Sequence, residues 1–244
     1  MSVGSVHASA PFEGSPYAPR PWLAHPYGVL RAVAIPDHPP PPDVLARLLP
    51  EERAFAAGLP PLRLSTWVAG RLALAAALGE LGADRAPLLA TPRGAPAVPA
   101  GFVGSISHKR RLAAALAAPD EGARLGLDVE DAAPRLHDIS RRILGDEELA
   151  AVDALAPDAR RRGVIVRFSI KEAIYKAVDP FVCRYVSFHE AFVDPGPPGA
   201  GVRAATARLE PREREGPFAI EATWAELDGY VVSAARIRSG QTSP

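Results

Sequence analysis

Residues 125–130, LGLDVE, and residues 158–178, DARRRGVIVRFSIKEAIYKAV, predict the strand and the long helix around which the second half of the chain is organised. The first segment alternates apolar and acidic residues, so in a strand Asp128 and Glu130 project from the same face. The second segment has the pattern of a helix, and the Asp179-Pro180 pair directly after it is expected to end that helix. Together they give this half of the chain an α+β character.

The rest of the chain repeats this mixture of strands and helices. In the first half we expect a strand at 27–35, helices at 43–49, 51–57 and 62–81, and strands at 104–108 and 112–118. In the second half we expect further helices at 138–144 and 146–155, and strands near 186–193, 202–209, 218–226 and 230–237. This order favours an α+β fold of two similar lobes over a doubly wound parallel sheet. The expected parts are an extended Pro-rich arm (1–26), an N-terminal lobe (27–120), a C-terminal lobe (121–238) and a tail (239–244).

The composition is that of an ordinary globular protein, with 48% hydrophobic and 23% charged residues in 244. The formal net charge of zero argues against bulk electrostatic attraction to nucleic acid or to an anionic membrane. The single cysteine, Cys183, excludes an internal disulfide and a cysteine-cluster metal site, which suits a reducing compartment. No apolar run reaches the length of a membrane span, so the cytoplasm is the expected location.

Lysine is rare in this chain and is placed selectively. Only three of the 28 cationic side chains are lysine: Lys109 follows a Ser-x-Ser-His-like segment, while Lys171 and Lys176 flank Glu172. Compact ammonium groups beside a carboxylate suit a site that binds phosphate oxygens. The alternative is an exposed helix on which Glu and Lys side chains simply pair at neighbouring positions.

The carboxylates suggest a metal site. Asp128 and Glu130 share a strand face, and paired like charges are costly in a buried strand unless a cation joins them. Oxygen-only ligands favour Mg²⁺, which takes one or two carboxylates together with substrate phosphates. Glu172 would supply a third carboxylate, one helical turn before Lys176. The alternative is a pair of solvated carboxylates on an exposed strand edge.

Further candidates for an anion site lie in the first half of the chain. Arg63 and Arg71 belong to the predicted 62–81 helix and, at eight residues apart, differ by roughly 80° in azimuth, so both could reach one phosphate. The alternative is that both arginines lie on the solvent-exposed face of this helix and bind no ligand. Ser107 and His108 could offer a hydroxyl and an imidazole to an anion, although a lone histidine is often structural.

The common motifs of nucleotide-binding proteins, dinucleotide-binding proteins, zinc proteases and serine hydrolases are absent, whereas the order of the motifs that are present points to a family. The chain has no GxxxxGK[ST], no GxGxxG opening a helix, no HExxH and no GxSxG. Its ordered motifs are Gly94-Ala95-Pro96, Gly104-Ser105-Ile106-Ser107-His108, Gly126-Leu127-Asp128-Val129-Glu130 and Phe168-Ser169-Ile170-Lys171-Glu172-Ala173-Ile174-Tyr175-Lys176. Over roughly residues 60 to 195, this series resembles the 4′-phosphopantetheinyl transferases. Arg63 and Arg71 around Trp67, with the segment 180–193, are most similar to the enterobactin-synthetase-associated subgroup of the large, surfactin-type class.

The resemblance implies a monomer of two pseudo-symmetric α+β lobes with coenzyme A bound in the cleft between them. The roles that it implies for individual residues are Mg²⁺ binding by Asp128, Glu130 and Glu172, pyrophosphate binding and catalysis by Lys176, contact with coenzyme A by Ser107, His108, Asp128 and Lys171, and binding of its 3′-phosphate by Arg63 and Arg71. Many relatives have G-K-P where this chain has Ala95, and Arg93 is the expected substitute. The role of Lys109 is left open.

The activity that the resemblance implies is that of a holo-[acyl-carrier-protein] synthase type enzyme. It would transfer 4′-phosphopantetheine from coenzyme A to a serine of an apo carrier protein and release 3′,5′-ADP, with Glu172 or a metal-bound water as base. The partners would be acyl, peptidyl or aryl carrier proteins of fatty-acid, polyketide or nonribosomal-peptide synthases, including those of siderophore and other secondary metabolism. Two alternatives are a Mg²⁺-dependent hydrolase of coenzyme A or another nucleotide, and a non-catalytic module that binds carrier protein or coenzyme A.

Overall fold

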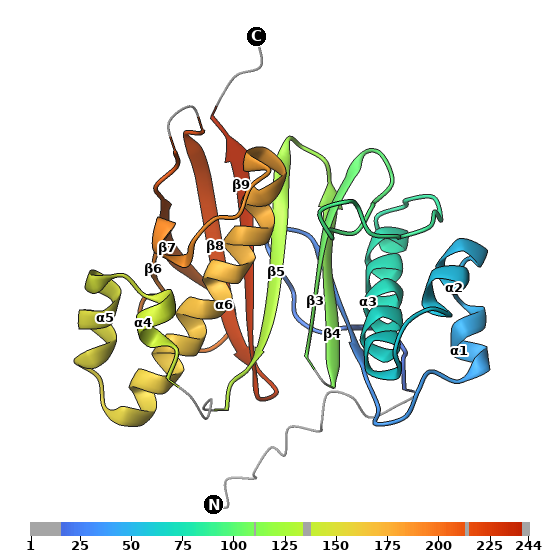
Figure 1. Cartoon of the computed structure of the whole chain (residues 1–244), viewed down its shortest axis with the longest axis horizontal. Coiled ribbons are helices and arrows are strands. Elements are labelled where there is room, and N and C mark those ends of the chain that lie inside the picture. The colour runs from blue at the N-terminus through green and yellow to red at the C-terminus, as the bar shows by residue number, and fades with distance from the viewer. Residues whose placement is uncertain (1–15, 110, 134–137, 213–214, 241–244) are drawn as a thin grey trace, which may run out of the picture.

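Two antiparallel sheets form the framework of the residues that the computed structural model describes, which are 16–109, 111–133, 138–212 and 215–240 (Figure 1). The first sheet has the order β1-β2-β4-β3, with β1 at Arg20–Pro21, β2 at Val29–Ala34, β4 at Leu112–Pro119 and β3 at Phe102–Lys109. The second has the order β5-β9-β8-β7-β6, with β5 at Ala123–Asp131, β9 at Tyr230–Ser239, β8 at Phe218–Leu227, β7 at Arg203–Leu209 and β6 at Ala191–Asp194. Each sheet therefore comes largely from one half of the chain.

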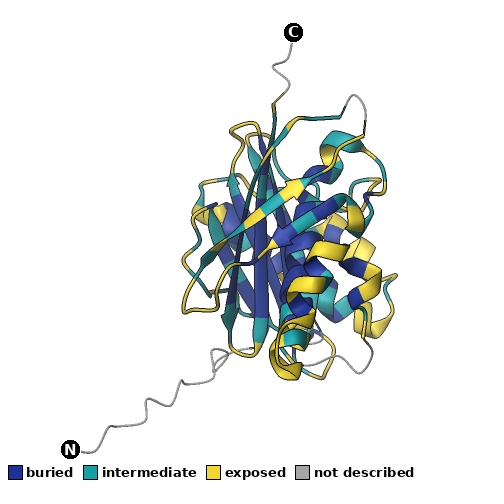
Figure 2. Cartoon of the chain, turned by 90° about the vertical axis from the view of Figure 1, so that its left-hand side faces the viewer, coloured by how far each residue is buried: buried dark blue, intermediate teal, exposed yellow. Residues whose placement is uncertain are grey.

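Each sheet is accompanied by a long helix and by shorter ones. The first half contains α1 (Pro42–Ala46), α2 (Pro50–Ala56) and α3 (Pro61–Glu80), and the second contains α4 (Ser140–Ile143), α5 (Asp146–Asp153), α6 (Pro157–Val182) and the 3₁₀ turn η1 (Phe188–Glu190). The helices α1, α2, α3 and α6 all begin with proline, whose fixed φ and missing N–H suit the first helical position. The strands at the centre of the molecule are largely buried, whereas the outer helix faces are exposed (Figure 2).

The two sheets meet at their edge strands β3 and β5. The hydroxyl of Ser105 accepts a hydrogen bond from the backbone N–H of Leu127 at 3.0 Å, and that of Ser107 accepts one from Val129 at 3.2 Å. Serine side chains thus satisfy buried N–H groups on the open edge of β5, which would otherwise lack partners. Each of these two bonds joins residues that are 22 positions apart in the sequence. A step of two residues along β3 therefore matches a step of two residues along β5 in the same direction, so the two strands are parallel.

Apolar packing on both sides of these sheets completes the framework. Helix α3 packs on the first sheet through Trp67, Val68 and Leu74, while α6 packs on the second through Ile170 and Ile174. A separate cluster joins the two sheets and includes Leu30, Leu116, Leu127 and Val232. The strand pair β3/β5 is therefore held between two helix-covered cores.

Gly126 allows α6 to lie directly on β5. A Cβ atom at this position would lie 1.8 Å from the carbonyl oxygen of Ala173 in α6. Since side chains two residues apart share a strand face, Asp128 and Glu130 also face α6. The close approach thus brings the carboxylates of the strand towards the helix that carries Glu172 and Lys176.

The N-terminal segment packs on the second sheet as well as pairing with the first. The indole Nε1 of Trp22 donates to Asp228 at 2.9 Å, and the imidazole Nε2 of His25 lies 3.1 Å from the hydroxyl of Thr223. Of the predicted arm 1–26, residues 1–15 lie outside the described part, and the remainder contributes the short strand β1.

The structure confirms a mixed α/β fold and most of the predicted elements, and it corrects two of them. Helix α6 does not end at Asp179-Pro180 but continues to Val182, because Pro180 lies in the last turn and costs only one backbone bond. Cys183, with a φ of 51°, ends it. The strand predicted at 186–193 begins only at Ala191, because residues 188–190 form η1, which is capped by Ser187.

Other predictions about the architecture stay predictions. These are the pseudo-symmetry of two lobes, a cleft between them and the domain boundaries at 120 and 238; residues 241–244 of the tail lie outside the described part. Among the helices of the described ranges, none has the length and apolar character to span a membrane.

We predict that Gly126→Ala destabilises the protein strongly. The added methyl group would collide with the backbone of α6, so the free energy of unfolding should fall by at least about 3 kcal/mol. Gly79→Ala in α3 is the matched control, because a Cβ atom there meets nothing within 4 Å and alanine favours the helix. Urea denaturation followed by circular dichroism measures both. Equal stability of the two variants would contradict the close approach of α6 to β5.

Candidate active site

A large cavity of about 550 Å³ lies where α3, α6, β3 and the loop 91–98 come together. It is lined by cationic side chains from separate parts of the chain, namely Arg63, Arg71, Arg93, Arg124 and Lys176. The acidic side chains on its wall are Asp120 and Asp179. Since cations outnumber acids on this wall, the cavity favours a ligand that carries several negative charges.

Arg63 and His108 contact each other at one end of this cavity. The Arg63 Nη1 lies 3.1 Å from the His108 Nε2. Burial, together with smaller effects of the nearby cations Arg63 and Lys176, lowers the pKa of His108 to about 4. The imidazole is therefore neutral at physiological pH, which lets its Nε2 accept a hydrogen bond from Arg63.

Arg71 is more deeply buried and is held from two sides. Its guanidinium lies over the ring of Trp67, with the Cζ atom 4.5 Å from the ring centroid, and its Nε donates to the carbonyl of Leu88 at 2.6 Å. Burial, opposed by Glu52 and assisted by the neighbouring Arg63, lowers the pKa of Arg71 to about 10. Arg71 is thus a fixed cation, and the nearby negative charge of Glu52 only partly offsets the effect of its burial.

Asp128 is the centre of a buried polar network at the β3/β5 junction. The hydroxyl of Ser107 donates to its Oδ1 at 3.1 Å, the hydroxyl of Ser169 donates to its Oδ2 at 3.0 Å, and the Lys176 ammonium donates to Oδ1 at 2.9 Å. The same ammonium also donates to the carbonyl of Leu127 at 2.8 Å and to Ser107 at 3.2 Å. The network fixes Lys176 at the boundary between the carboxylates and the cavity.

Glu130 and Glu172 lie within electrostatic reach of Asp128. Burial raises the pKa of Glu172, Asp128 raises it further, Lys176 partly offsets this, and Glu130 adds to the increase. Glu130 is itself paired with Lys109, whose Nζ lies 2.6 Å from its Oε1. Three carboxylates thus repel one another here, and ammonium groups neutralise two of them.

These residues fit a hard divalent cation by their chemistry. They offer only oxygen donors, and a cation would offset the negative charge that Asp128 and Glu130 place near the half-buried Glu172. Within the described ranges, no group of three His, Cys, Asp or Glu side chains already converges as a metal site. Two of these carboxylates are instead paired with ammonium groups, Glu130 with Lys109 and Asp128 with Lys176.

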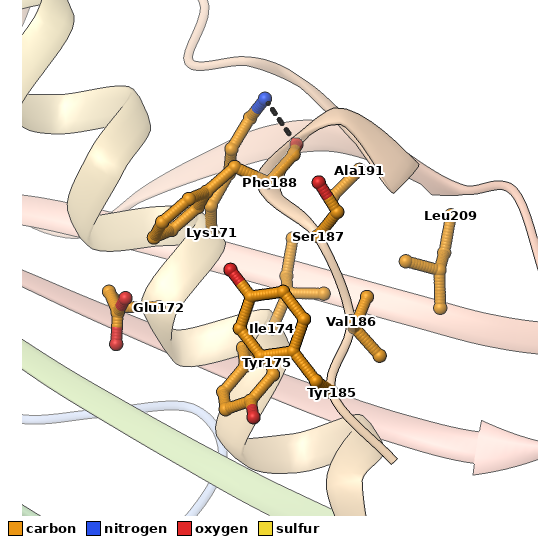
Figure 3. Close-up of a pocket in the computed structure, with 10 residues that line it drawn as sticks. All are labelled: Lys171, Glu172, Ile174, Tyr175, Tyr185, Val186, Ser187, Phe188, Ala191 and Leu209. Atoms are coloured by element: carbon orange, nitrogen blue, oxygen red, sulfur yellow. Dashed lines mark hydrogen bonds between the residues drawn. The ribbon is translucent and has the colours of Figure 1, made fainter. Parts of the chain in front are cut away.

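Lys171 does not line this cavity, in contrast to its predicted contact with coenzyme A. Its ammonium is buried and donates to Glu148 at 2.6 Å, to the carbonyl of Ile143 at 2.8 Å and to that of Phe188 at 2.9 Å. Figure 3 shows its side chain directed towards Phe188 and away from Glu172. Lys171 thus has all three of its donors satisfied in the core, and we remove it from the proposed ligand contacts.

A smaller apolar cavity of about 130 Å³ lies beside Glu172 (Figure 3). Its walls include Ile174, Val186, Phe188 and Leu209, together with Tyr175 and the exposed Tyr185. Tyr175 also lines the larger cavity, so this residue borders both spaces.

Arg93 reaches the larger cavity but already has an acidic partner. Its Nε donates to Asp179 at 2.8 Å, and its Nη2 forms a second bond to the same carboxylate, which raises the pKa of Arg93. The sequence pattern predicts Asp179 only as part of a helix end and does not indicate that Arg124 and Tyr175 line the cavity. The position of Tyr175 directly before Lys176 could have indicated that it lies near the cavity. The pairing of Arg93 with Asp179 has no local signal in the sequence, because the two residues are 86 positions apart.

On a two-sheet α/β framework, a cationic cavity with a wall lysine that bonds a buried aspartate, and with two further carboxylates near that aspartate, is typical of enzymes acting on phosphorylated substrates. Comparison with known proteins narrows this class. Residues 51–118 match the 4′-phosphopantetheinyl transferase N-terminal domain, and residues 124–234 match the 4′-phosphopantetheinyl transferase superfamily. The chain belongs to this superfamily.

Individual relatives agree with this assignment. The chain is 33% identical over 205 residues to the 4′-phosphopantetheinyl transferase Svp of Streptomyces mobaraensis, covering 81% of each protein. It is 30% identical over 146 residues to PptT of Mycobacterium tuberculosis (strain ATCC 25618 / H37Rv), covering 59% of this chain and 64% of PptT.

Among solved structures, the chain is similar to the holo-[acyl-carrier-protein] synthase of Thermotoga maritima. The identity is 20% and the TM-score 0.37, with 47% of this chain and 62% of that chain covered. The chain thus covers less than two thirds of PptT and of the Thermotoga protein. Membership of the surfactin-type class and of the enterobactin-associated subgroup stays a prediction.

We predict that Lys171→Met lowers the free energy of unfolding by about 3–5 kcal/mol, because it leaves the Glu148 carboxylate buried without its cation. Arg161→Met in the same helix removes an exposed pair with Asp158 and should cost at most about 1 kcal/mol. Urea denaturation distinguishes the two variants. A small loss for both would mean that Lys171 is not a core ion-pair residue.

Proposed function

We propose that the protein transfers 4′-phosphopantetheine from coenzyme A to a serine hydroxyl of an apo carrier protein and releases 3′,5′-ADP. The observation that carries this proposal is the cavity lined by cations that includes Lys176, whose ammonium bonds the buried Asp128 beside the half-buried Glu172. Coenzyme A has phosphates at two places, and the cations are likewise distributed along the cavity wall. The similarity to Svp and PptT, both 4′-phosphopantetheinyl transferases, supports the same activity.

The cations suggest how the donor is held. Arg63 and Arg71, on one side of α3, bind the 3′-phosphate, with neutral His108 orienting Arg63. Arg93 uses its Nε and Nη2 edge for Asp179, which leaves its Nη1 for the ligand. Lys176 contacts the pyrophosphate from the end of the cavity nearest Asp128.

A divalent cation, with Mg²⁺ as the expected one, would be held by Asp128, Glu130 and Glu172. When bound, it would polarise the pyrophosphate and offset the mutual repulsion of these carboxylates. Ser107 and Ser169 keep Asp128 oriented by donating to its two oxygens.

The chemistry of the protein's own residues follows from their surroundings. The serine oxygen of the acceptor attacks the phosphorus that carries the pantetheine arm, and the bond from that phosphorus to the bridging oxygen breaks. The serine proton passes to Glu172, directly or through a water, since burial and neighbouring carboxylates raise the proton affinity of this group. The Lys176 ammonium offsets the charge that develops on the leaving 3′,5′-ADP.

The acceptors to test are acyl, peptidyl and aryl carrier proteins, because the proposed reaction needs an exposed serine on a folded partner. A role in siderophore or other secondary metabolism, a monomeric state and a cytoplasmic location belong to this proposal as well.

The direct test is to incubate the protein with coenzyme A, Mg²⁺ and a panel of apo carrier proteins and to weigh the carriers by mass spectrometry. We predict a mass increase of one phosphopantetheine group, its loss on chelation of divalent ions and its return when Mg²⁺ is added. Release of 3′,5′-ADP without modified carrier would indicate a hydrolase instead. Modification that persists in excess chelator would refute the metal assignment.

We predict that Lys176→Ala lowers kcat by about a hundredfold while the KM for coenzyme A changes much less, because the ammonium acts mainly on charge that develops in the transition state. Lys176→Arg should rescue poorly, since a planar guanidinium cannot reproduce the three bonds to Leu127, Ser107 and Asp128. Steady-state kinetics on one carrier measures both variants, with thermal melting to confirm folding. A raised KM with an intact kcat would make Lys176 a simple binding residue.

A further inference from the structure

Glu52, on α2, is a fully buried carboxylate that does not reach either cavity. Its exposed fraction is 0%, and its Oε2 accepts hydrogen bonds from the backbone N–H of Leu49 at 2.8 Å and from Arg85 at 3.2 Å. Its Oε1 accepts one from the backbone N–H of Leu88 at 2.9 Å. A carboxylate without exposure is costly and is usually replaced by an apolar residue unless its position serves a purpose.

The Leu88 peptide connects this carboxylate to the ligand cavity. The N–H of Leu88 donates to Glu52, and the C=O of the same residue accepts the Nε of Arg71 at 2.6 Å. Glu52 thus fixes the residue whose carbonyl in turn fixes the Arg71 guanidinium. The negative charge of Glu52 also supports the cationic form of Arg71 against the effect of burial.

A second contact from α2 reaches the same guanidinium through an aromatic ring. Phe55, one turn after Glu52, packs against Trp67 with ring centroids 5.1 Å apart. The Trp67 ring in turn lies 4.5 Å from the Arg71 Cζ. Helix α2 therefore restrains Arg71 both in the plane of the guanidinium, through Leu88, and from its face, through Trp67.

These contacts occupy the inner edge of Arg71 and leave the outer edge for a ligand. In the part of the chain that the structure describes, the hydrogen bond found for Arg71 comes from Nε, and the side chain lines the larger cavity. Arg71 is held at its Nε by Leu88 and on one face of its guanidinium by the Trp67 ring. Its two terminal nitrogens therefore point in a fixed direction, which suits bidentate binding of a phosphate.

We propose that Glu52 is a positioning residue that acts through the Leu88 peptide to hold Arg71 in the orientation that recognises the 3′-phosphate of coenzyme A. This inference rests on the proposed function, in which Arg71 binds that phosphate. Groups that orient a ligand-binding side chain commonly change its affinity for the ligand by about tenfold or more when they are removed.

The experiment compares coenzyme A with dephospho-coenzyme A, which lacks only the 3′-phosphate, by titration calorimetry on the full-length protein. Arg71→Ala should weaken coenzyme A strongly and dephospho-coenzyme A little. Glu52→Gln should weaken the binding of coenzyme A by about tenfold and that of dephospho-coenzyme A by less than about twofold. The glutamine amide would place an NH₂ group where the carboxylate oxygen accepts from Leu49 and Arg85, and this mismatch would disturb the Leu88 peptide. In the Glu52→Gln/Arg71→Ala double variant, the ratio of the two affinities should equal that of Arg71→Ala alone.

Arg85→Ala is the matched control, since it removes the side-chain donor to Glu52 and leaves the Leu88 contact in place. The ratio of the two affinities in this variant should equal that of the wild type. Glu52→Asp, which keeps the charge and shortens the reach, should shift the ratio in the same direction but less, and it serves if Glu52→Gln does not fold. A merely structural role for Glu52 would weaken both ligands equally, and that result would overturn the inference.

The outcome also separates this inference from the function on which it rests. A ratio that changes in Arg71→Ala but not in the Glu52 variants overturns only the positioning role. A ratio that is unchanged in both refutes the assignment of Arg71 to the 3′-phosphate, and the positioning role with it.

Discussion

The neutralisation of one buried carboxylate, that of Asp128, is the constraint on which the site depends. Asp128 is 4% exposed, so both oxygens need donors, and these come from Ser107 on β3 and from Ser169 and Lys176 on α6. The hydroxyl of Ser107 simultaneously accepts the N–H of Val129 and so closes the junction between the two sheets. The demand of one charge for partners thus fixes the relative positions of β3, β5 and α6.

The same junction sets the electrostatics of the cavity. On one side of Lys176 lie carboxylates that raise the pKa of Glu172, and on the other lie cations that help to lower the pKa of His108 to about 4. A site with proton-accepting groups on one side of a lysine and anion-binding groups on the other is preorganised for the transfer of a phosphorylated group, because little reorganisation is needed when charge develops. Lys176 stands at the boundary between the two regions.

Two other buried carboxylates each bond a residue that is next to a proposed ligand contact. Glu148 holds Lys171 in the core beside the loop that walls the apolar cavity, and Glu52 holds the Leu88 peptide that bonds Arg71. Neither carboxylate lines the larger cavity. Charges that are expensive to bury therefore fix the elements that carry Arg71 and Glu172, and this rigidity is what a precise binding site requires.

Local periodicity let the sequence alone determine which residues share a face. The alternation in 125–130 placed Asp128 and Glu130 together, and helical spacing placed Lys176 one turn after Glu172. It could not show that Lys171 turns into the core while Lys176 faces the cavity, because that depends on Glu148, which is 23 residues away along the chain. Likewise, the pairing of Arg93 with Asp179 and the extension of α6 past Pro180 needed the folded chain. Spacing along one element fixes directions within that element, whereas the partner that decides the role of a charge comes from a distant segment, which only the tertiary structure brings near.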